Sequence, residues 1–375
     1  MADNKDKKVL NVPHLRFPEF SGEWEKCSIQ DYGEVVTGNT PPTSHAEYYE
    51  NGSYLWASPA DLGINKNITE TKTKLSLSGF KKTRSIPKGS VLVTCIGSTI
   101  GKMGMAAETM SSNQQINSIV VNDKSNSDFV YYAICRAFPR YLSEVAVQAV
   151  PILSKSNFEK LPNYTTCRDE QDKIGYFLNL LDERIATQNK IIEKLESLIK
   201  GLAHRITEMG KPNVRIAECL ECTSSTLQES EVSDLGTYPV YGANGIVGYL
   251  DSYNTSDEAI YIVKDGSGVG SVIYVKGRCS ATGTLNILTA KQDYSLQFLY
   301  YLLRVFNYDP YKTGMAIPHI YFKDYGKAKI FCPPYAWQLR YAQMLDAIDT
   351  KLLTEQKFLI SLNCQKQYLL RQMFI

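Results

Sequence analysis

Residues 169–202 read DEQDKIGYFLNLLDERIATQNKIIEKLESLIKGL, and apolar side chains recur along this stretch at steps of four and three. Such spacing is the a/d pattern of a coiled-coil seam, which runs along one side of an α-helix. We therefore predict one long amphipathic helix, with a seam made of Ile174, Leu178, Leu181, Ile185, Ile192, Leu195, Ile199 and Leu202.

The chain contains this helix pattern twice. The second copy lies 167 residues further on, and Gln188, the polar gap in the first seam, corresponds to Glu355 in the second. Polar groups at the same level of two paired helices fix their register at some cost in stability. Two copies in one chain favour an internal antiparallel pair, with a dimerising coiled coil as the alternative. The second seam consists of Tyr341, Leu345, Ile348, Leu352, Leu359, Leu362, Lys366 and Leu369, and we assign the helix seam or subunit interface to Leu178, Leu181, Ile185, Gln188, Leu345, Ile348, Leu352 and Glu355.

The repeat extends beyond the helices. Residues 97–101 (GSTIG) lie 169 positions before residues 266–270 (GSGVG), and Ile116-Asn117 bears the same relation to Leu285-Asn286. A globular domain followed by a long helix is thus written twice, as an internal pseudo-twofold repeat. We predict an α+β fold of two tandem domains joined by two long antiparallel coiled-coil helices. The expected boundaries are 1–20 for a tail and strap, 21–165 for the first domain, 166–208 for the first helix, 209–334 for the second domain and 335–375 for the second helix.

Short runs of β-branched and aromatic residues, separated by turn signals, fill both globular domains. Before them, residues 13–20 are too rich in proline for a helix, so we predict an extended anchoring strap that follows a charged, disordered tail. The expected strands are 90–96, 118–122, 238–249, 259–263 and 271–275, and the expected domain helices are 127–142 and 296–306.

Composition bounds the class of protein. The 375 residues, 43% of them hydrophobic, provide enough material for two cores. A net charge of +2 argues against a protein that coats nucleic acid, because such proteins are strongly basic. Nine cysteines, an odd number, and an N-terminus without an apolar signal core favour free thiols in a reducing cytoplasm. No apolar run approaches the roughly 20 residues that span a membrane, so no membrane location is expected.

The motifs of the chain predict neither a catalytic nor a metal site. In residues 266–270 a strand follows where a Rossmann turn needs a helix, and residues 97–102 lack the Ser or Thr after the P-loop lysine. We interpret both as structural turns with amides available to a DNA phosphate. The C-x-x-C of Cys219 and Cys222 has no second pair at zinc spacing. Residues 332–335 (CPPY) carry cysteine where base methyltransferases need Asn or Asp.

One stretch of the chain is strongly basic. From Lys66 to Lys88, seven Lys and Arg residues accompany the single acid Glu70, interleaved with Ser and Thr. This composition suits a phosphate backbone, and a merely solvated face is the alternative. We assign DNA contact to Lys72, Lys74, Lys81, Lys82, Arg84 and Lys102 in the first domain and to Lys264, Arg278, Tyr311 and Lys312 in the second.

With these motifs in the order of a tandem repeat, the chain resembles the specificity (S) subunit of type I restriction-modification enzymes. The resemblance covers nearly the whole chain. Its features are the strap 15–18 (LRFP) leading to Trp24, the stretches 96–102 (IGSTIGK) and 113–118 (NQQINS), the turn 316–318 (AIP), Gln171 and Gln338 at the helix starts, and the closing 369–374 (LLRQMF).

This resemblance implies two target recognition domains, each reading one half of a split sequence in double-stranded DNA. The helices are expected to dock two modification (methyltransferase) subunits, and restriction (translocase and nuclease) subunits join that core. It further implies a non-catalytic subunit, with S-adenosylmethionine, ATP and Mg used by the partners. Residues 280–284 (SATGT) depart from the glutamine-rich stretch of the first domain. The alternatives are a stand-alone DNA methyltransferase, which the missing cofactor motif disfavours, and a coiled-coil adaptor without DNA contact.

Overall fold

The computed structural model describes residues 10–145, 151–266, 268–314 and 317–375. The predicted tail, Ser267 of the second glycine turn and Ala316 lie outside these ranges. The described chain forms two compact units, one built from residues up to 189 together with 358–375 and the other from residues 190–357. Each unit is described by itself below.

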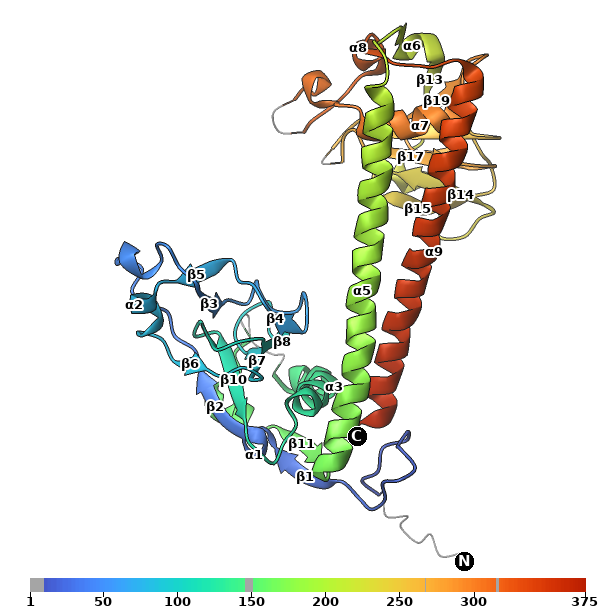
Figure 1. Cartoon of the computed structure of the whole chain (residues 1–375). Coiled ribbons are helices and arrows are strands. Elements are labelled where there is room, and N and C mark those ends of the chain that lie inside the picture. The colour runs from blue at the N-terminus through green and yellow to red at the C-terminus, as the bar shows by residue number, and fades with distance from the viewer. Residues whose placement is uncertain (1–9, 146–150, 267, 315–316) are drawn as a thin grey trace, which may run out of the picture. The chain divides into compact units, whose positions relative to one another are not determined.

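Two long helices belong partly to the first unit and partly to the second, with the division after residue 189 in one helix and after residue 357 in the other. They are α5 (Arg168–Thr207) and α9 (Tyr335–Met373), green and red in Figure 1. In the first unit Ile174 and Leu178 of α5 share a core with Leu369 and Met373 of α9. The start of α5 therefore packs on the end of α9, and the helices run antiparallel as predicted.

The apolar seam explains why these segments are helical and paired. Leu178, Leu345 and Leu352 are buried, and Leu181, Ile185 and Ile348 are half-buried. Burying a leucine side chain stabilises the fold by about 1.5–3 kcal/mol, so the repeated seam is a major source of stability. Gln188 is also buried. The prediction that Gln188 and Glu355 lie at the same level of the paired helices concerns residues of different units, and it stays a prediction.

The first unit contains a five-stranded sheet of order β2-β10-β7-β8-β4, a four-stranded sheet of order β5-β3-β9-β6, and the ribbon β1-β11. Its elements are β1 (Glu25–Ser28), α1 (Ile29–Tyr32), β2 (Gly33–Thr37), η1 (Ala46–Tyr48), β3 (Tyr54–Ala57), β4 (Asn67–Ile68), β5 (Thr73–Leu75), α2 (Leu77–Phe80), β6 (Ser85–Ile86), β7 (Val91–Thr94), β8 (Met103–Ala106), β9 (Met110–Ser112), β10 (Ile116–Val121), α3 (Ser127–Val145), α4 (Lys155–Glu159) and β11 (Pro162–Thr165).

The second unit repeats this plan with a four-stranded sheet of order β13-β19-β16-β17, a three-stranded sheet of order β15-β14-β18, and the ribbon β12-β20. Its elements are β12 (Val214–Arg215), α6 (Ile216–Cys219), β13 (Leu220–Ser224), η2 (Glu229–Glu231), β14 (Tyr238–Gly242), β15 (Gly245–Leu250), β16 (Ala259–Val263), β17 (Val272–Val275), β18 (Ser280–Ala281), β19 (Leu285–Ala290), α7 (Leu296–Val305), η3 (Asp309–Tyr311), α8 (Phe322–Tyr325) and β20 (Lys329–Ile330).

The repeat holds at the level of strand register. Asn117 of β10 pairs with Val93 of β7, and Asn286 of β19 pairs with Ile262 of β16, which keeps the predicted offset of 169 on both strands. The pairs β3–β9 and β14–β18 are both parallel. The predicted strands and domain helices are present with ends shifted by a few residues, and a turn divides residues 238–249 into β14 and β15.

The two glycine stretches are hairpin turns, between β7 and β8 and between β16 and β17. Gly97 and Gly101 have φ of 94° and 89°, and Gly266 and Gly270 have φ of 96° and 91°, the left-handed region that favours glycine. The structural interpretation is therefore right. The N–H groups of all four glycines donate to backbone carbonyls within their own unit, so these four amides are not available to a DNA phosphate.

The predicted strap ties the start of the chain to both long helices. Arg16 makes a two-pronged ion pair with the buried Glu170 of α5, at 2.7 and 2.8 Å, which raises the pKa of the guanidinium. The Leu15 N–H donates to the Gln372 carbonyl of α9 at 2.8 Å. Trp24 packs on Phe374. Trp24 and Phe374 thus belong to the core of the first unit, and Phe17 of the strap packs against it.

A buried glutamine connects each long helix to the domain that precedes it. The Gln171 Oε1 accepts from the Asn126 N–H at 2.9 Å, and its Nε2 donates to the Thr166 carbonyl at 2.7 Å. Gln338 repeats the arrangement with the Ser295 N–H and the Pro333 carbonyl, both at 2.9 Å. Both glutamines are 2% exposed. Each amide therefore satisfies backbone groups at the start of a domain helix and at the entry of a long helix.

Replacing Gln171 by Ala is expected to lower the free energy of unfolding by about 3 kcal/mol, because buried groups left without partners cost about 1–3 kcal/mol each. Urea unfolding followed by circular dichroism measures the change. The matched control is Gln343→Ala at an exposed position of α9, which should stay within about 0.5 kcal/mol of the wild type. Equal losses in the two variants would contradict the role of Gln171.

Candidate nucleic-acid interface and helix grooves

The most exposed basic segment of the first unit follows α2. The Ser76 hydroxyl caps α2 by accepting from the Gly79 N–H at 3.2 Å, and Lys81 and Lys82 follow the helix with exposed side chains. Asn39 holds the segment, since its Nδ2 donates to the Lys82 carbonyl at 2.8 Å and its Oδ1 accepts from the Arg84 N–H at 2.8 Å. The backbone is therefore fixed while the two ammonium groups point into solvent.

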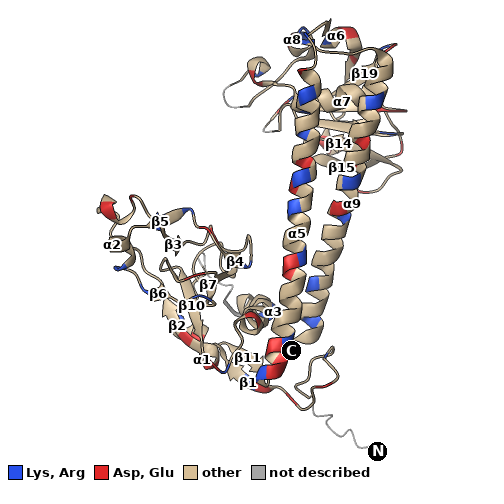
Figure 2. Ribbon diagram, viewed as in Figure 1, with Lys and Arg blue, Asp and Glu red and all other residues tan. Residues whose placement is uncertain are grey.

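The other predicted residues of this region lie on the four-stranded sheet. Lys72 and Lys74 belong to the edge at β5, where Lys72 is exposed and Lys74 half-buried. Arg84 lies beside β6, the opposite edge, and its Nη1 donates to the Thr37 carbonyl at 2.8 Å. Lys and Arg accordingly appear along the part of the first unit that carries α2, β5 and β6 (Figure 2).

Lys66, the first residue of the basic stretch, is not part of this surface. Its side chain is 6% exposed, and its Nζ donates to Asp128 of α3 at 2.6 Å and to Asn179 of α5 at 2.8 Å. The prediction of a continuous basic face from Lys66 to Lys88 is therefore wrong at its start. The ion pair with Asp128, which lies far away in the sequence, removes the Lys66 charge from the surface. Lys102 is exposed but lies on the other sheet, at the start of β8 and beside Gly63.

The predicted residues of the second unit form separate groups. Arg278 is exposed, stacks on Tyr253 at 5.1 Å and donates to the Tyr238 hydroxyl at 3.4 Å, which raises the pKa of the guanidinium. Tyr311 stacks on Phe306, and Lys312 pairs with Asp309 at 2.7 Å. Lys264 is half-buried beside the second glycine turn. The predicted DNA-contacting residues of the second unit therefore have separate local partners and do not share one segment, as Lys81, Lys82 and Arg84 do in the first unit.

Sequence reasoning did not single out two polar pairs. The Thr40 hydroxyl donates to the exposed Gln114 side chain at 2.5 Å, and the His319 Nδ1 lies 2.8 Å from the Asp265 carboxylate. Each pair joins residues more than 50 positions apart. Nothing in the local sequence indicates such partners.

The two cysteines of the C-x-x-C motif have different surroundings. Among the residues that the structure describes, no group of His, Cys, Asp and Glu is arranged to hold a metal ion. All nine cysteines fall in the described ranges and are free thiols. Cys219 shares a hydrogen bond with Cys332, which lowers the pKa of the Cys219 thiol. Cys222 instead lies in β13. Within those ranges no helix is both long and apolar enough to cross a bilayer.

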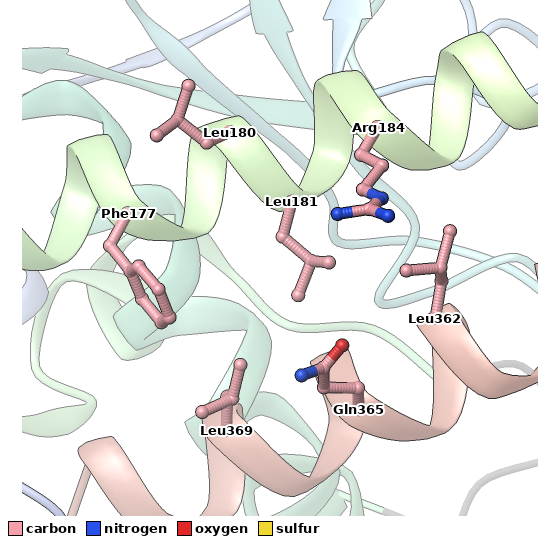
Figure 3. A pocket seen from close by; sticks show the side chains of 7 residues that line it. All are labelled: Phe177, Leu180, Leu181, Arg184, Leu362, Gln365 and Leu369. Carbon is pink, nitrogen blue, oxygen red and sulfur yellow. The ribbon is translucent and has the colours of Figure 1, made fainter.

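Each unit has an apolar groove between its halves of α5 and α9. In the first unit a groove of about 230 Å³ is lined by Phe177, Leu180, Leu181 and Arg184 of α5 and by Leu362, Gln365 and Leu369 of α9 (Figure 3). In the second unit a groove of about 410 Å³ is lined by Leu202, Arg205, Ile206, Glu208, Met209, Tyr341 and Met344. The repeat offset of 167 relates Phe177 to Met344 and Leu202 to Leu369, so two of the seven lining residues of each groove have an equivalent in the other.

Comparison with known proteins decides the family. The model of the type I restriction modification DNA specificity domain matches residues 21–197 and again residues 213–363. The chain belongs to this family. The two matches correspond to the two copies of the repeat, so the chain holds two DNA specificity domains in tandem.

Individual members of the family show the same likeness. The specificity subunit of the type I restriction enzyme EcoprrI from Escherichia coli is 20% identical over 359 residues, 88% of each chain. The HindI specificity subunit from Haemophilus influenzae is 28% identical over 186 residues, 47% of this chain and 40% of that relative. The crystal structure of an S subunit from M. genitalium aligns with a TM-score of 0.67 at 19% identity, covering 97% of this chain and 99% of that one.

For a DNA specificity domain, the exposed pair Lys81 and Lys82 provides a test of phosphate contact. Changing both to Ala should weaken binding to all duplexes alike and reduce the slope of log K against log salt by up to about 1.8, since each phosphate contact contributes about 0.9. The measurement is a salt titration of DNA affinity with the full chain. The control, Lys190→Ala with Lys200→Ala, removes the same charge from exposed positions of α5. An unchanged slope would show that the segment is only solvated.

Proposed function

We propose that this chain is the DNA-recognition subunit of a type I restriction-modification complex and that it reads a bipartite sequence, one half with each unit. The observation that carries this proposal is the repeat. The two units share their framework, since Asn117 and Asn286 have equivalent strand partners, whereas surface positions differ, as the exposed Gln114 and the half-buried Gly283 do. Shared frameworks with different surfaces support two readers of different sequences.

The subunit itself is proposed to be non-catalytic. We infer that S-adenosylmethionine, ATP and Mg are bound by modification and restriction subunits of the complex, which works in a reducing cytoplasm. The support is the absence from the sequence of a cofactor-binding glycine motif and of a nucleophile or general-base set. The chain's recognised role is then to select the DNA and to hold the subunits that act on it.

The deciding experiment is to co-express the chain with a modification subunit and to map methylated bases over a whole genome. The expected result is methylation at one split sequence, with two defined halves and an unread spacer of fixed length. The isolated chain should neither bind S-adenosylmethionine nor methylate DNA. Methyl transfer by the isolated chain would favour a stand-alone methyltransferase, and assembly without any DNA affinity would favour an adaptor.

Two modification subunits are proposed to dock on the two apolar grooves. Phe177 and Met344 are 38% and 40% exposed at repeat-equivalent positions of α5 and α9, each beside the groove of its own unit. Exposed apolar surface of this kind marks interaction sites. Because Phe177 and Met344, and likewise Leu369 and Leu202, are repeat-equivalent lining residues, two copies of the same partner are favoured over two different partners.

Changing Phe177 to Asp is expected to release one of the two modification subunits, and Met344→Asp the other, because each places a charge in an apolar contact. Mass photometry of the reconstituted complex reads the stoichiometry, and the double variant should lose both copies. Retention of both modification subunits by each single variant would place the docking surface elsewhere. Circular dichroism of each variant checks that the chain remains folded.

A further inference from the structure

A part-buried polar network joins the first DNA specificity domain to the long helices. Lys66, in the loop before β4, donates to Asp128 and, at 3.1 Å, to the Tyr132 hydroxyl of α3. The same Nζ reaches Asn179 of α5. Lys66 is therefore bonded to two different helices from one sheet edge, where its carbonyl accepts from the Met105 N–H of β8 at 2.6 Å.

The network continues into the second long helix. The Tyr132 hydroxyl donates to Asp182 of α5 at 2.7 Å, and Lys366 of α9 pairs with the same carboxylate at 2.5 Å. Lys66 also lies over the Tyr132 ring at 4.5 Å. Two lysines and two carboxylates thus neutralise each other among a sheet edge, a domain helix and both long helices. Lys366 occupies a polar position of the second seam, in addition to Glu355.

Such a network fixes geometry better than it adds stability. Burying charges costs nearly as much as their attraction returns, so an apolar cluster of similar volume would often be at least as stable. The directional hydrogen bonds of a fully paired polar group, in contrast, allow few alternative arrangements. An apolar contact between the domain and α5 would tolerate small rotations, whereas the three acceptors around the Lys66 ammonium would not.

In the second unit, the domain helix α7 is bonded to the long helix α9 without a lysine from the sheet edge. The repeat equivalents of Asp128 and Asn179 are Gln297 and Asp346, and the Gln297 Nε2 donates directly to Asp346 at 2.6 Å. Tyr301 lies 3.5 Å from Asp349, as Tyr132 faces Asp182 in the first unit. The connection between domain helix and long helix is therefore kept in both units, and Lys66 is a feature of the first.

We propose that Lys66 is a positioning residue that sets the orientation of the first DNA specificity domain on α5 and thereby the length of the spacer between the two half-sites. This inference rests on the proposed reading of a bipartite sequence. Because α5 is one continuous helix of 40 residues shared by both units, a rotation of the domain on α5 displaces its half-site along the DNA. The residues that touch the DNA keep their places within the domain.

The test removes the bonds to α5 and leaves the ion pair of Lys66 with Asp128 in place. Asn179→Ala combined with Tyr132→Phe does so, and methylated bases are mapped for the complex with the modification subunit. Both half-site sequences should be unchanged. Sites whose spacer is one base pair longer or shorter should gain methylation by about tenfold, as expected when hydrogen bonds to a charged group are lost. The control, Asn189→Ala with Tyr176→Phe, removes the same groups from exposed positions of α5 and should keep the wild-type spacer.

A rescue uses the arrangement of the second unit. Lys66→Met alone should broaden the spacer, and adding Asp128→Gln with Asn179→Asp installs the pairing of Gln297 with Asp346 and should restore it. A role in stability alone predicts no such recovery of spacing. If the first double variant does not fold, Lys66→Met and this triple variant decide the matter, and a folded triple variant with a broad spacer overturns the proposal.

Two further results would overturn it. A wild-type spacer in the double variant means that the network only stabilises the unit, and a degenerate first half-site at unchanged spacer means that Lys66 acts through the DNA face. Failure of the proposed function is distinguishable, because the wild-type complex would then show no split methylated sequence at all.

Discussion

Each long helix carries a buried glutamine in its first turn, and the position of each domain helix against its long helix depends on this side chain. The amides of Gln171 and Gln338 satisfy backbone groups of the domain helix on one side and of the helix entry on the other. A buried N–H or carbonyl without a partner is costly, so few other side chains can take this position. The domain helix and the long helix are thereby held in one relation in both copies of the repeat.

The two copies of the repeat share their backbone framework and differ in their solvent-exposed residues. Strand register, glycine turns and the cap of the first short helix recur, with an acidic side chain three residues into α1 and α6 accepting from the Ser28 and Arg215 N–H groups. The exposed loops differ, whereas the glycine turns keep equivalent partners, since the Gly97 and Gly266 N–H groups donate to the carbonyls of Pro151 and Pro318. A pair of recognition units can diverge in this way because surface substitutions seldom alter the free energy of unfolding by more than about 0.5 kcal/mol.

Polar groups inside the helix seam have a structural use. Lys366 is a polar residue of the second seam, and it pairs with Asp182 of α5 within the first unit. Burial raises the pKa of Tyr132 in the same network far above its usual range, so that its hydroxyl stays protonated and donates to Asp182. The polar residue Lys366, which breaks the apolar heptad pattern, therefore contributes to the contact between the long helices and the first domain.

The tandem repeat, the two long helices, the α+β class and the family could all be predicted from the amino-acid sequence. Heptad spacing and a constant offset between copies are local properties of the chain, and the seam from Ile174 to Leu202 follows from them alone. Which charges are exposed depends instead on the folded structure. Lys66 and Lys82 look alike in one basic stretch, yet Lys66 is buried against Asp128 and Asn179 while Lys82 is exposed. The physical reason is that the partners of a buried charge come from residues distant in sequence, which no local pattern specifies.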